Sequence, residues 1–356
     1  MPPLTSIEKL DLLSLTKVGM EKFVHAQGWK PYRAEQILRW MYQRGVTQVE
    51  HMTDLSIQDR THLGDIATIN WPTITDVFQS RDGTAKFLIR LHDDASIETV
   101  LIPERDRRTL CISTQVGCSL DCRFCLTAEL GLKRNLTAGE IIGQFLCVQE
   151  HIEKTNKTPP RLTNVVMMGM GEPLANIGPV RDAIQNMIHG RCGLGLSPRR
   201  ITVSTAGIHH KFKDIVELGV NLAVSLNAST NEQRNAIMPA ANQLCSLPDL
   251  LAACRSLALP HRRRLTFEYV LLRGVNDSPQ DAVRLAGSIR GIPCMVNVIP
   301  FNEIPGSPYT RPDEATILEF QDILIRRNID TYLRKSKGPD VLGACGQLGA
   351  SARQVL

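Results

Sequence analysis

Short apolar runs alternate with stretches of helical periodicity over the last two thirds of the chain. From about Thr109 onward, six runs rich in β-branched and other apolar residues predict strands. They are Thr109–Val116, Leu162–Met168, Ile201–Thr205, Leu222–Leu226, Leu265–Leu272 and Met295–Phe301. The helical stretches between them include Ala138–Ile152, Val180–Ile188, Lys211–Leu218 and Pro279–Ile289. Strands that alternate with helices indicate βαβ units and a parallel sheet.

The number of these units limits the possible architectures. Six strand–helix units fit a partial (β/α)6 barrel, and the same count fits an open doubly wound sheet. Both belong to the α/β class, and both place functional residues at the carboxyl ends of the strands. We therefore expect the chemistry of residues 109–356 to lie just after the apolar runs.

The first part of the chain follows a different pattern. Residues 1–72 are polar with helical periodicity, for example around Leu38, Trp40 and Met41, which predicts a small, mainly helical domain. This domain is expected to end where β-like stretches begin, near residue 73.

Residues 73–108 predict a short β extension that leads into the barrel. Phe87–Leu91 and Ser96–Ile102 flank the turn residues His92-Asp93-Asp94, which is a β-hairpin signal. Within this hairpin, Glu98 taken alone is typical of the solvent face of an edge strand.

The composition is that of a folded protein with a large core. Hydrophobic residues make up 43% of the chain and charged residues 22%, which argues against disorder and fibrous structure. No signal-peptide pattern follows Met1, and no apolar run approaches the roughly 20 residues that a membrane span needs. We expect a cytoplasmic protein with no membrane partner.

The net charge of +5 permits an RNA partner without requiring one. Solvated surface is the plain alternative for the basic clusters, and Arg262, Arg263 and Arg264 are one candidate phosphate-binding patch. The clusters are Arg105–Arg107–Arg108, Arg199–Arg200, His261–Arg262–Arg263–Arg264 and Arg326–Arg327.

Three of the ten cysteines form the strongest signal in the chain. Cys118, Cys122 and Cys125 lie within eight residues, directly after the first predicted barrel strand. Without a secretion signal, closely spaced cysteines more often bind metal than form disulfides. A structural zinc site normally needs four ligands, usually as two separated pairs, and no second pair is present. Three thiolates without a fourth favour a [4Fe–4S] cluster with one open iron, and a zinc knuckle completed by a distant cysteine is the alternative.

The spacing CxxxCxxC, with Phe124 before the last cysteine, resembles the radical S-adenosylmethionine (SAM) superfamily. Gly169-Met170-Gly171-Glu172-Pro173 resembles its glycine-rich SAM-binding segment. A narrower resemblance, to the RlmN/Cfr family of radical SAM RNA methyltransferases, covers nearly the whole chain. It rests on Ser204-Thr205, Ser225-Leu226-Asn227-Ala228, Pro300-Phe301-Asn302 and Ala344-Cys345-Gly346-Gln347-Leu348, together with Cys111 and Glu98.

This resemblance implies a partial (β/α)6 radical SAM barrel in residues 109–356, with a catalytic cysteine loop near its end. It makes residues 1–72 an accessory RNA-binding domain. It implies a [4Fe–4S] cluster on Cys118, Cys122 and Cys125, and two SAM molecules per turnover. The SAM-binding residues implied are Gly171, Glu172, Ser204, Ser225, Leu226, Asn227 and Asn302.

The implied reaction is methylation of carbon 2 of one adenosine in 23S ribosomal RNA and in tRNA anticodon loops. In the family, the cysteine that matches Cys345 first accepts a methyl group and then bonds to the RNA through a methylene. The cysteine that matches Cys111 releases the product by forming a transient disulfide with it, and the residue that matches Glu98 accepts a proton. An electron donor such as flavodoxin or ferredoxin is also implied.

Two alternatives remain open at the level of sequence. A C8-specific enzyme of the Cfr type, acting on 23S ribosomal RNA, carries the same motifs. A non-catalytic, zinc-binding RNA-binding module would also place three cysteines on a loop. Without the family resemblance, Cys111 would be interpreted as a buried strand cysteine and Cys345 as a surface thiol.

Overall fold

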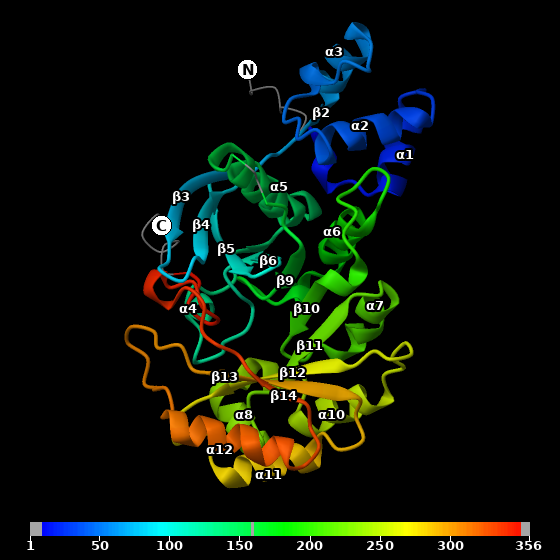
Figure 1. Cartoon of the computed structure of the whole chain (residues 1–356). Helices are drawn as coiled ribbons and strands as arrows, with labels where there is room; N and C mark the ends of the chain where they lie inside the picture. The colour runs from blue at the N-terminus through cyan, green and yellow to red at the C-terminus, as the bar shows by residue number, and fades with distance from the viewer. Residues whose placement is uncertain (1–8, 158–159, 350–356) are drawn as a thin grey trace, which may run out of the picture.

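The computed structural model describes residues 9–157 and 160–349, and one ten-stranded sheet runs through it (Figure 1). The strand order is β14-β13-β12-β11-β10-β9-β6-β5-β4-β3. From β6 to β14 all neighbouring strands are parallel, as the βαβ pattern predicts. These strands are β6 (Arg107–Cys111), β9 (Asn164–Met167), β10 (Ile201–Thr205), β11 (Asn221–Ser225), β12 (Leu265–Leu271), β13 (Cys294–Pro300) and β14 (Thr331–Leu333).

The predicted partial barrel is confirmed, with two differences. The parallel part has a seventh strand, β14, which is only three residues long and gives no apolar run. The predicted run Thr109–Val116 is also divided. The sheet strand β6 ends at Cys111, and β7 (Gln115–Val116) pairs with β8 (Arg134–Asn135) outside the main sheet. The chain leaves the sheet between them because Gln144 holds the backbone N–H and C=O of Ser113 through its side-chain amide.

The predicted hairpin is confirmed as part of a larger antiparallel extension. Strands β4 (Ala85–Arg90) and β5 (Ser96–Glu104) pair in antiparallel register, and β3 (Thr73–Gln79) adds a strand that the sequence did not predict. On its other side β5 pairs with β6. Glu98 therefore lies on an interior strand, so its interpretation as a solvent-facing edge residue is wrong.

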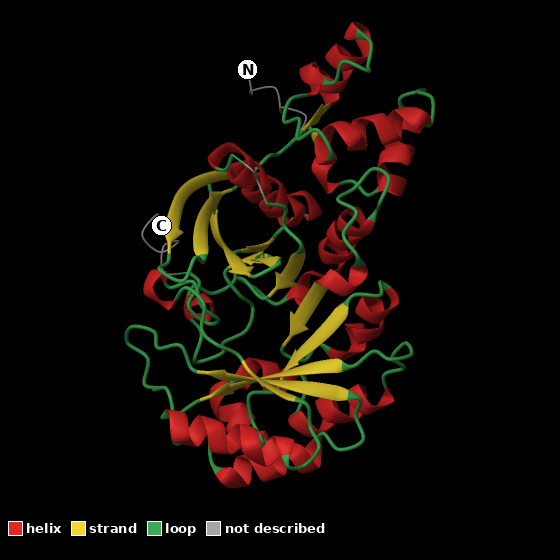
Figure 2. Ribbon diagram, viewed as in Figure 1, coloured by secondary structure: helices red, strands yellow, loops and turns green. Residues whose placement is uncertain are grey.

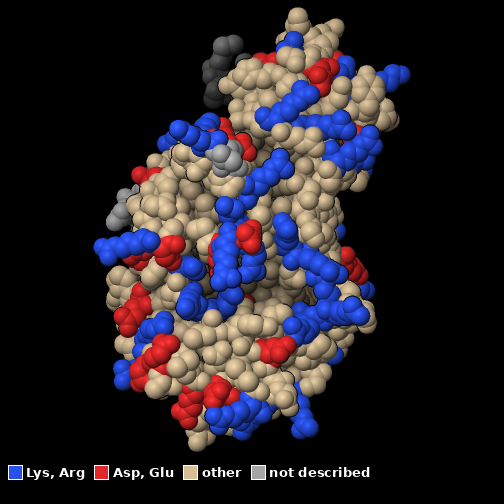
Figure 3. Space-filling view, viewed as in Figure 1, with Lys and Arg blue, Asp and Glu red and all other residues tan. Residues whose placement is uncertain are grey.

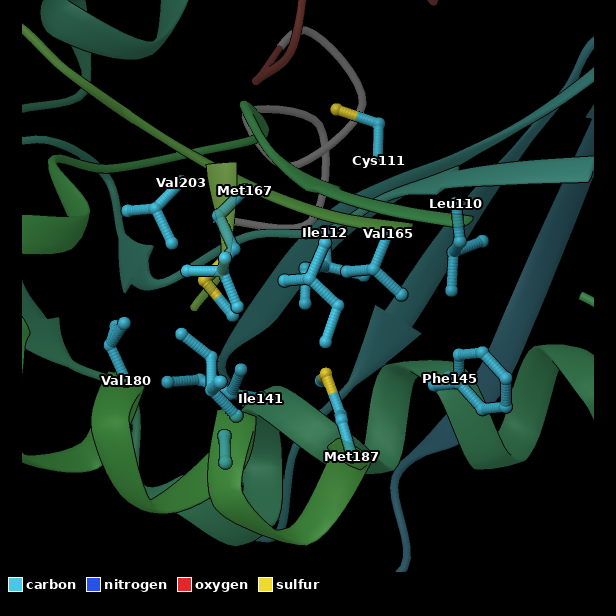
Figure 4. Close-up of a cluster of buried hydrophobic side chains, with 14 of the residues drawn as sticks. Leu110, Cys111, Ile112, Ile141, Phe145, Val165, Met167, Val180, Met187 and Val203 are labelled. Atoms are coloured by element: carbon cyan, nitrogen blue, oxygen red, sulfur yellow. The ribbon is translucent and has the colours of Figure 1, made fainter. Parts of the chain in front are cut away.

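Two helices cover the outer face of the first parallel strands. Side chains of β6, β9 and β10 interdigitate with those of α5 (Ala138–Thr155) and α6 (Ile177–Ile188) in the main core (Figure 4). In Figure 4, Leu110 and Ile112 point toward the helices, whereas Cys111 between them points to the opposite side. This follows from the alternation of side chains along a strand, and it directs Cys111 into the interior of the barrel.

Further helices surround the rest of the barrel (Figure 2). They are α4 (Leu126–Glu129), α7 (Phe212–Glu217), α8 (Asn231–Ile237), α9 (Pro239–Leu244), α10 (Leu247–Ser256), α11 (Pro279–Ser288) and α12 (Glu314–Ile325). None of the helices in the described residues is both long enough and apolar enough to span a bilayer.

The N-terminal region is mainly helical, as predicted, and packs against α5 and α6. It contains α1 (Lys17–Ala26), α2 (Tyr32–Tyr42) and α3 (Ile57–Ile66), with a small parallel pair of β1 (Leu10–Asp11) and β2 (Ala67–Thr68). Asn186 of α6 donates its amide to the carbonyl oxygen of Leu15 and to the hydroxyl of Tyr42. These bonds join the helical region to the outer layer, away from the carboxyl ends of the strands.

Candidate active site

The cysteine loop leaves β7 and ends at the start of α4. Its entry requires glycine, because Gly117 has φ +80° and a Cβ there would lie 1.7 Å from the carbonyl oxygen of Gly131. This close approach lets the N–H of Cys118 donate to the same oxygen at 3.2 Å. The middle of the loop is fixed by Asp121, whose carboxylate accepts from the N–H of Ala240 in α9. The backbone of the loop is thus held on two sides.

The donor set of this loop fits an iron–sulfur cluster better than a single zinc ion. In one tetrahedral zinc site with bonds of 2.3 Å, the sulfur atoms would lie about 3.8 Å apart. The three sulfur atoms of Cys118, Cys122 and Cys125 do not all lie within 4.8 Å of one another. A cluster accepts the wider spacing because each thiolate binds a different iron.

Burial also affects the protonation of the three thiols. It raises the pKa of Cys118 to about 12, and it raises the pKa values of Cys122 and Cys125 as well. Metal binding at this loop must therefore displace protons.

The cysteine loop forms one wall of an open cavity at the carboxyl ends of the strands. Its opposite wall comes from the ends of β9 to β13, where polar side chains replace the apolar ones of the core. Of the predicted cofactor-binding residues, Gly171, Glu172, Ser204, Ser225, Asn227 and Asn302 line the cavity together with all three loop cysteines and Cys345. Leu226 is buried and does not line it.

Glu172 is fixed in the cavity wall by backbone donors. Its carboxylate accepts from the N–H of Leu174 at 3.0 Å and from that of Ala206 at 2.8 Å. Burial raises its pKa, and these bonds oppose the rise. Gly171 allows the approach of this segment, because its φ is +102° and a Cβ would lie 2.5 Å from the Cβ of Gln115. The result is an oriented acidic group, suited to an ammonium ligand.

Two predicted SAM-binding residues use their side chains for contacts within the protein. Asn227 donates to the sulfur of Met238 and accepts from the N–H of Val270. Asn302 donates to the carbonyl oxygen of Cys345 at 3.0 Å and accepts from the hydroxyl of Ser336. Asn302 therefore positions the backbone of Cys345 at the cavity.

The C-terminal segment is also tied to the cysteine loop. The N–H of Leu126 donates to the carbonyl oxygen of Gly346 at 2.8 Å, and the hydroxyl of Thr127 donates to that of Leu348 at 2.7 Å. These bonds bring Cys345 beside the loop cysteines, although more than two hundred residues separate them in the chain.

A second cavity adjoins the first and is lined by both Cys345 and Cys111. The two cavities share Met168, Ile299, Asn302 and Cys345 as lining residues. Burial raises the pKa of Cys111, and the nearby Cys345 raises it further. Desolvation by the surrounding protein raises the pKa of the Cys345 thiol to about 11, and the negative charge of Glu268 raises it further. The two thiols are thus close enough to interact.

Glu98 is fully buried and lines neither cavity. Its carboxylate lies 3.5 Å from the ammonium group of Lys86, which is also buried, and accepts from the N–H of Gly349 at 3.1 Å. The segment that carries Cys345 thus covers Glu98.

Glu268 is a candidate that the sequence analysis missed. It is buried in β12 and lines the first cavity, and burial raises its pKa to about 7. The amide of Asn297 donates to its carboxylate at 2.9 Å. A charged residue in the middle of the apolar run Leu265–Leu272 was the available signal.

The candidate patch of Arg262, Arg263 and Arg264 lies at the amino ends of the strands. Arg263 donates to the side chain of Asn221, the first residue of β11, and Arg264 pairs with Asp330. This end of the sheet is opposite the cysteine loop, so the patch is not part of the candidate active site.

Comparison with known proteins gives two family matches. Residues 10–69 match the ribosomal RNA large subunit methyltransferase N-terminal domain, and residues 112–286 match the radical SAM superfamily.

Individual relatives are similar over nearly the whole chain. The dual-specificity RNA methyltransferase RlmN of Syntrophus aciditrophicus is 44% identical, over 97% of this chain and 98% of its own length. That of Geobacter sulfurreducens is 47% identical, over 95% of this chain and 92% of its own length. The crystal structure of a radical SAM methyltransferase from Sphaerobacter thermophilus matches with a TM-score of 0.88 and 39% identity, covering 95% of this chain and 99% of that one.

Proposed function

Because the chain belongs to the RlmN family of radical SAM RNA methyltransferases, we propose that it methylates carbon 2 of a specific adenosine in 23S ribosomal RNA and in tRNA anticodon loops. The cofactors are a [4Fe–4S] cluster and SAM. The proposed reaction would use two SAM molecules per turnover. The superfamily match and the wide spacing of the loop sulfurs both argue against a zinc-binding module without catalytic activity.

One observation carries the proposal. A single cavity is lined by the three loop cysteines, by Glu172 and by Cys345, and Cys111 lies in the adjoining cavity. A methyltransferase that used SAM only as an electrophile would need neither the cysteine loop nor the second thiol. An adenine ring carbon is a poor nucleophile, so this methyl transfer requires radical chemistry.

In this proposal Cys118, Cys122 and Cys125 hold three irons, and the fourth iron is open to SAM. When bound, the cluster supplies the electron that cleaves SAM to methionine and a 5′-deoxyadenosyl radical. Gly171, Glu172, Ser204, Ser225, Asn227 and Asn302, which line the first cavity, would bind SAM, whereas Leu226 lies outside its lining. Glu172 is supported best, because its buried and oriented carboxylate can pair with the amino group of SAM.

The two remote cysteines would carry the methyl group and release the product. The sulfur of Cys345 accepts a methyl group from one SAM as its own proton leaves. The S-methyl group would then give a hydrogen atom to the 5′-deoxyadenosyl radical, and its carbon would bond to the adenine ring. To restore the ring, the adduct must lose the proton of the ring carbon and one electron, which the oxidised cluster could take back. Cys111 attacks the sulfur of Cys345, so that a disulfide forms while the bond from sulfur to the new methyl carbon breaks and that carbon takes up a proton. Glu98 would accept the proton of the ring carbon, which requires the segment around Gly349 to move.

The remaining parts of the chain have supporting roles in this proposal. Residues 1–72 form an accessory RNA-binding domain, residues 73–108 lead into the barrel, and residues 109–356 form the catalytic core. A donor such as flavodoxin or ferredoxin would supply electrons. Ribosomal and transfer RNA substrates make the cytoplasm the place of reaction.

Mass spectrometry of the product tests the function. Anaerobically reconstituted protein is incubated with methyl-labelled SAM and a 23S ribosomal RNA fragment, and the nucleosides are analysed. Label in 2-methyladenosine is expected, whereas 8-methyladenosine would make the enzyme C8-specific. Cys118→Ala should lose iron and turnover, while Cys294→Ala, at the amino end of β13, should retain both. Active, air-purified protein that retains stoichiometric zinc would overturn the proposal.

A further inference from the structure

Three cations follow β14 and line the cavity that holds both remote cysteines. We call Arg334, Lys335, Ser336 and Lys337 the cationic strip. In the described part of the chain no carboxylate lies within 4.0 Å of its three cations. The one acidic residue that lines the same cavity, Glu104, already pairs with Arg107. Among the described residues, Lys335 and Lys337 in this wall therefore have no carboxylate within ion-pair distance.

The backbone of the strip is fixed at three points. The N–H of Arg334 donates to the carbonyl oxygen of Val298, and the hydroxyl of Ser336 donates to Asn302. The N–H of Gly338, directly after the strip, donates to the carboxylate of Asp82 at 3.1 Å. A fixed backbone lowers the entropy cost when the lysine side chains bind a ligand.

The strip is coupled to the reactive cysteine through one residue. Asn302 accepts from Ser336 and donates to the carbonyl oxygen of Cys345. Arg334 lines the second cavity, and its positive charge opposes the rise that burial causes in the pKa values of Glu268 and Cys345. Lys335 and Lys337 remain available to an external anion.

The rest of the lining indicates what kind of anion fits. Apart from the cations, the wall contains the apolar residues Ile102, Met168, Ile299, Leu333 and Leu348. An apolar interior with a cationic rim matches a nucleotide, whose flat base is apolar on its faces and whose phosphates are anionic. Lys and Arg side chains also gather around a hollow in the middle of the face shown in Figure 3.

We propose that Lys335 and Lys337 bind the phosphates that flank the target nucleotide, and so direct its base into this second cavity beside Cys345. The proposal rests on the proposed function and names the contacts that hold the substrate. An enzyme that reacts with a base must remove it from its stack, and phosphate contacts fix the position of the nucleotide that enters. Since the strip and Cys345 share Asn302, binding of the phosphates would set the base beside the thiol.

The test compares two double variants that each lose two positive charges. K335Q/K337Q changes the strip, and R199Q/R262Q changes the cationic cavity at the amino ends of the strands. The probe is an RNA stem-loop with the target adenosine in its single-stranded loop, and its Kd is measured at several salt concentrations. Each lost contact to single-stranded RNA should reduce the slope of log K against log salt by about 0.7. K335Q/K337Q should thus lose a slope of about 1.4 and bind roughly tenfold more weakly near 0.15 M salt.

Other measurements separate this role from its alternatives. In K335Q/K337Q, S-methylation of Cys345 by SAM without RNA should be unchanged, as read from the mass of the tryptic peptide with Cys345. Loss of this methylation would assign the strip to SAM and overturn the proposal. The proposal would also be overturned if K335Q/K337Q bound RNA normally but its cluster were reduced more slowly by a protein electron donor. If the wild-type protein methylates the RNA but K335Q/K337Q binds the RNA as tightly as R199Q/R262Q does, the phosphate site is wrong and the proposed function stands. Wild-type protein that does not bind the RNA would overturn both proposals.

Discussion

Replacing Lys86 with Met should destabilise the protein far more than replacing a surface lysine. The side chains of Lys86 and Glu98 are 2% and 0% exposed, and their charged atoms lie 3.5 Å apart. Burial lowers the pKa of Lys86, and the carboxylate of Glu98 opposes this effect. Met fills a similar volume, so the main loss is the charge. Removal of the ammonium group takes a charged partner away from the buried carboxylate of Glu98, which costs about 3–5 kcal/mol.

The control is an ion pair on the surface. Lys17 and Glu21 lie 2.8 Å apart on α1, but their side chains are 34% and 42% exposed. Lys17→Met should therefore destabilise the protein much less than Lys86→Met, because water solvates the remaining carboxylate. Urea unfolding of anaerobically prepared protein measures both differences.

A double variant tests the physical reason. Lys86→Met with Glu98→Leu removes both buried charges and should be more stable than Lys86→Met alone. The reasoning is refuted if Lys86→Met lowers the free energy of unfolding no more than Lys17→Met does. It is also refuted if the loss in the double variant equals the sum of the losses in Lys86→Met and Glu98→Leu.

Three further predictions concern the site. Cys111→Ala should keep the cluster and accumulate as a covalent complex with RNA through Cys345, seen as an RNA-shifted band, whereas normal turnover would exclude the resolving role. Gly117→Ala should reduce the iron content, because its Cβ would lie 1.7 Å from the carbonyl oxygen of Gly131, and full iron content would show that the loop adapts. Burial raises the pKa of Glu268 from 4.5 to about 7, so the folded state binds this proton more tightly than the unfolded state does. Its contribution to stability is complete below about pH 4.5 and is lost as the pH rises through 7, by up to about 3 kcal/mol. The free energy of unfolding, measured at pH 5 and pH 8, should show this loss in wild-type protein and not in Glu268→Gln. Equal changes in the two proteins would refute the raised pKa of Glu268.

Local patterns were enough to predict most of the sheet. The apolar runs located β9 to β13 to within about two residues, because a strand covered on both faces needs a continuous series of apolar side chains. The spacing of the loop cysteines likewise predicted a metal-binding loop. Both signals lie within a short segment, so no distant contact was needed to recognise them.

Short or polar elements were not predictable in the same way. β14 has three residues and β3 is mostly exposed, so neither gives a distinctive pattern. Their existence depends on partners that supply hydrogen bonds across the sheet. The added strands in turn decide which residues are interior, and Glu98 is buried because β4 and β6 lie on both sides of β5.

The sequence by itself thus determined the fold class and the family, and it nominated the candidate reactive side chains. Only the tertiary structure decided which of them meet. It brings Cys345 beside the loop cysteines and Cys111, buries Glu98 with Lys86, and adds Glu268 to the cavity. The physical reason is that secondary structure and metal-ligand spacing are encoded by neighbours in the chain. Burial, pKa and the approach of two thiols depend instead on residues far apart in sequence, which only the packed sheet and its C-terminal segment bring together.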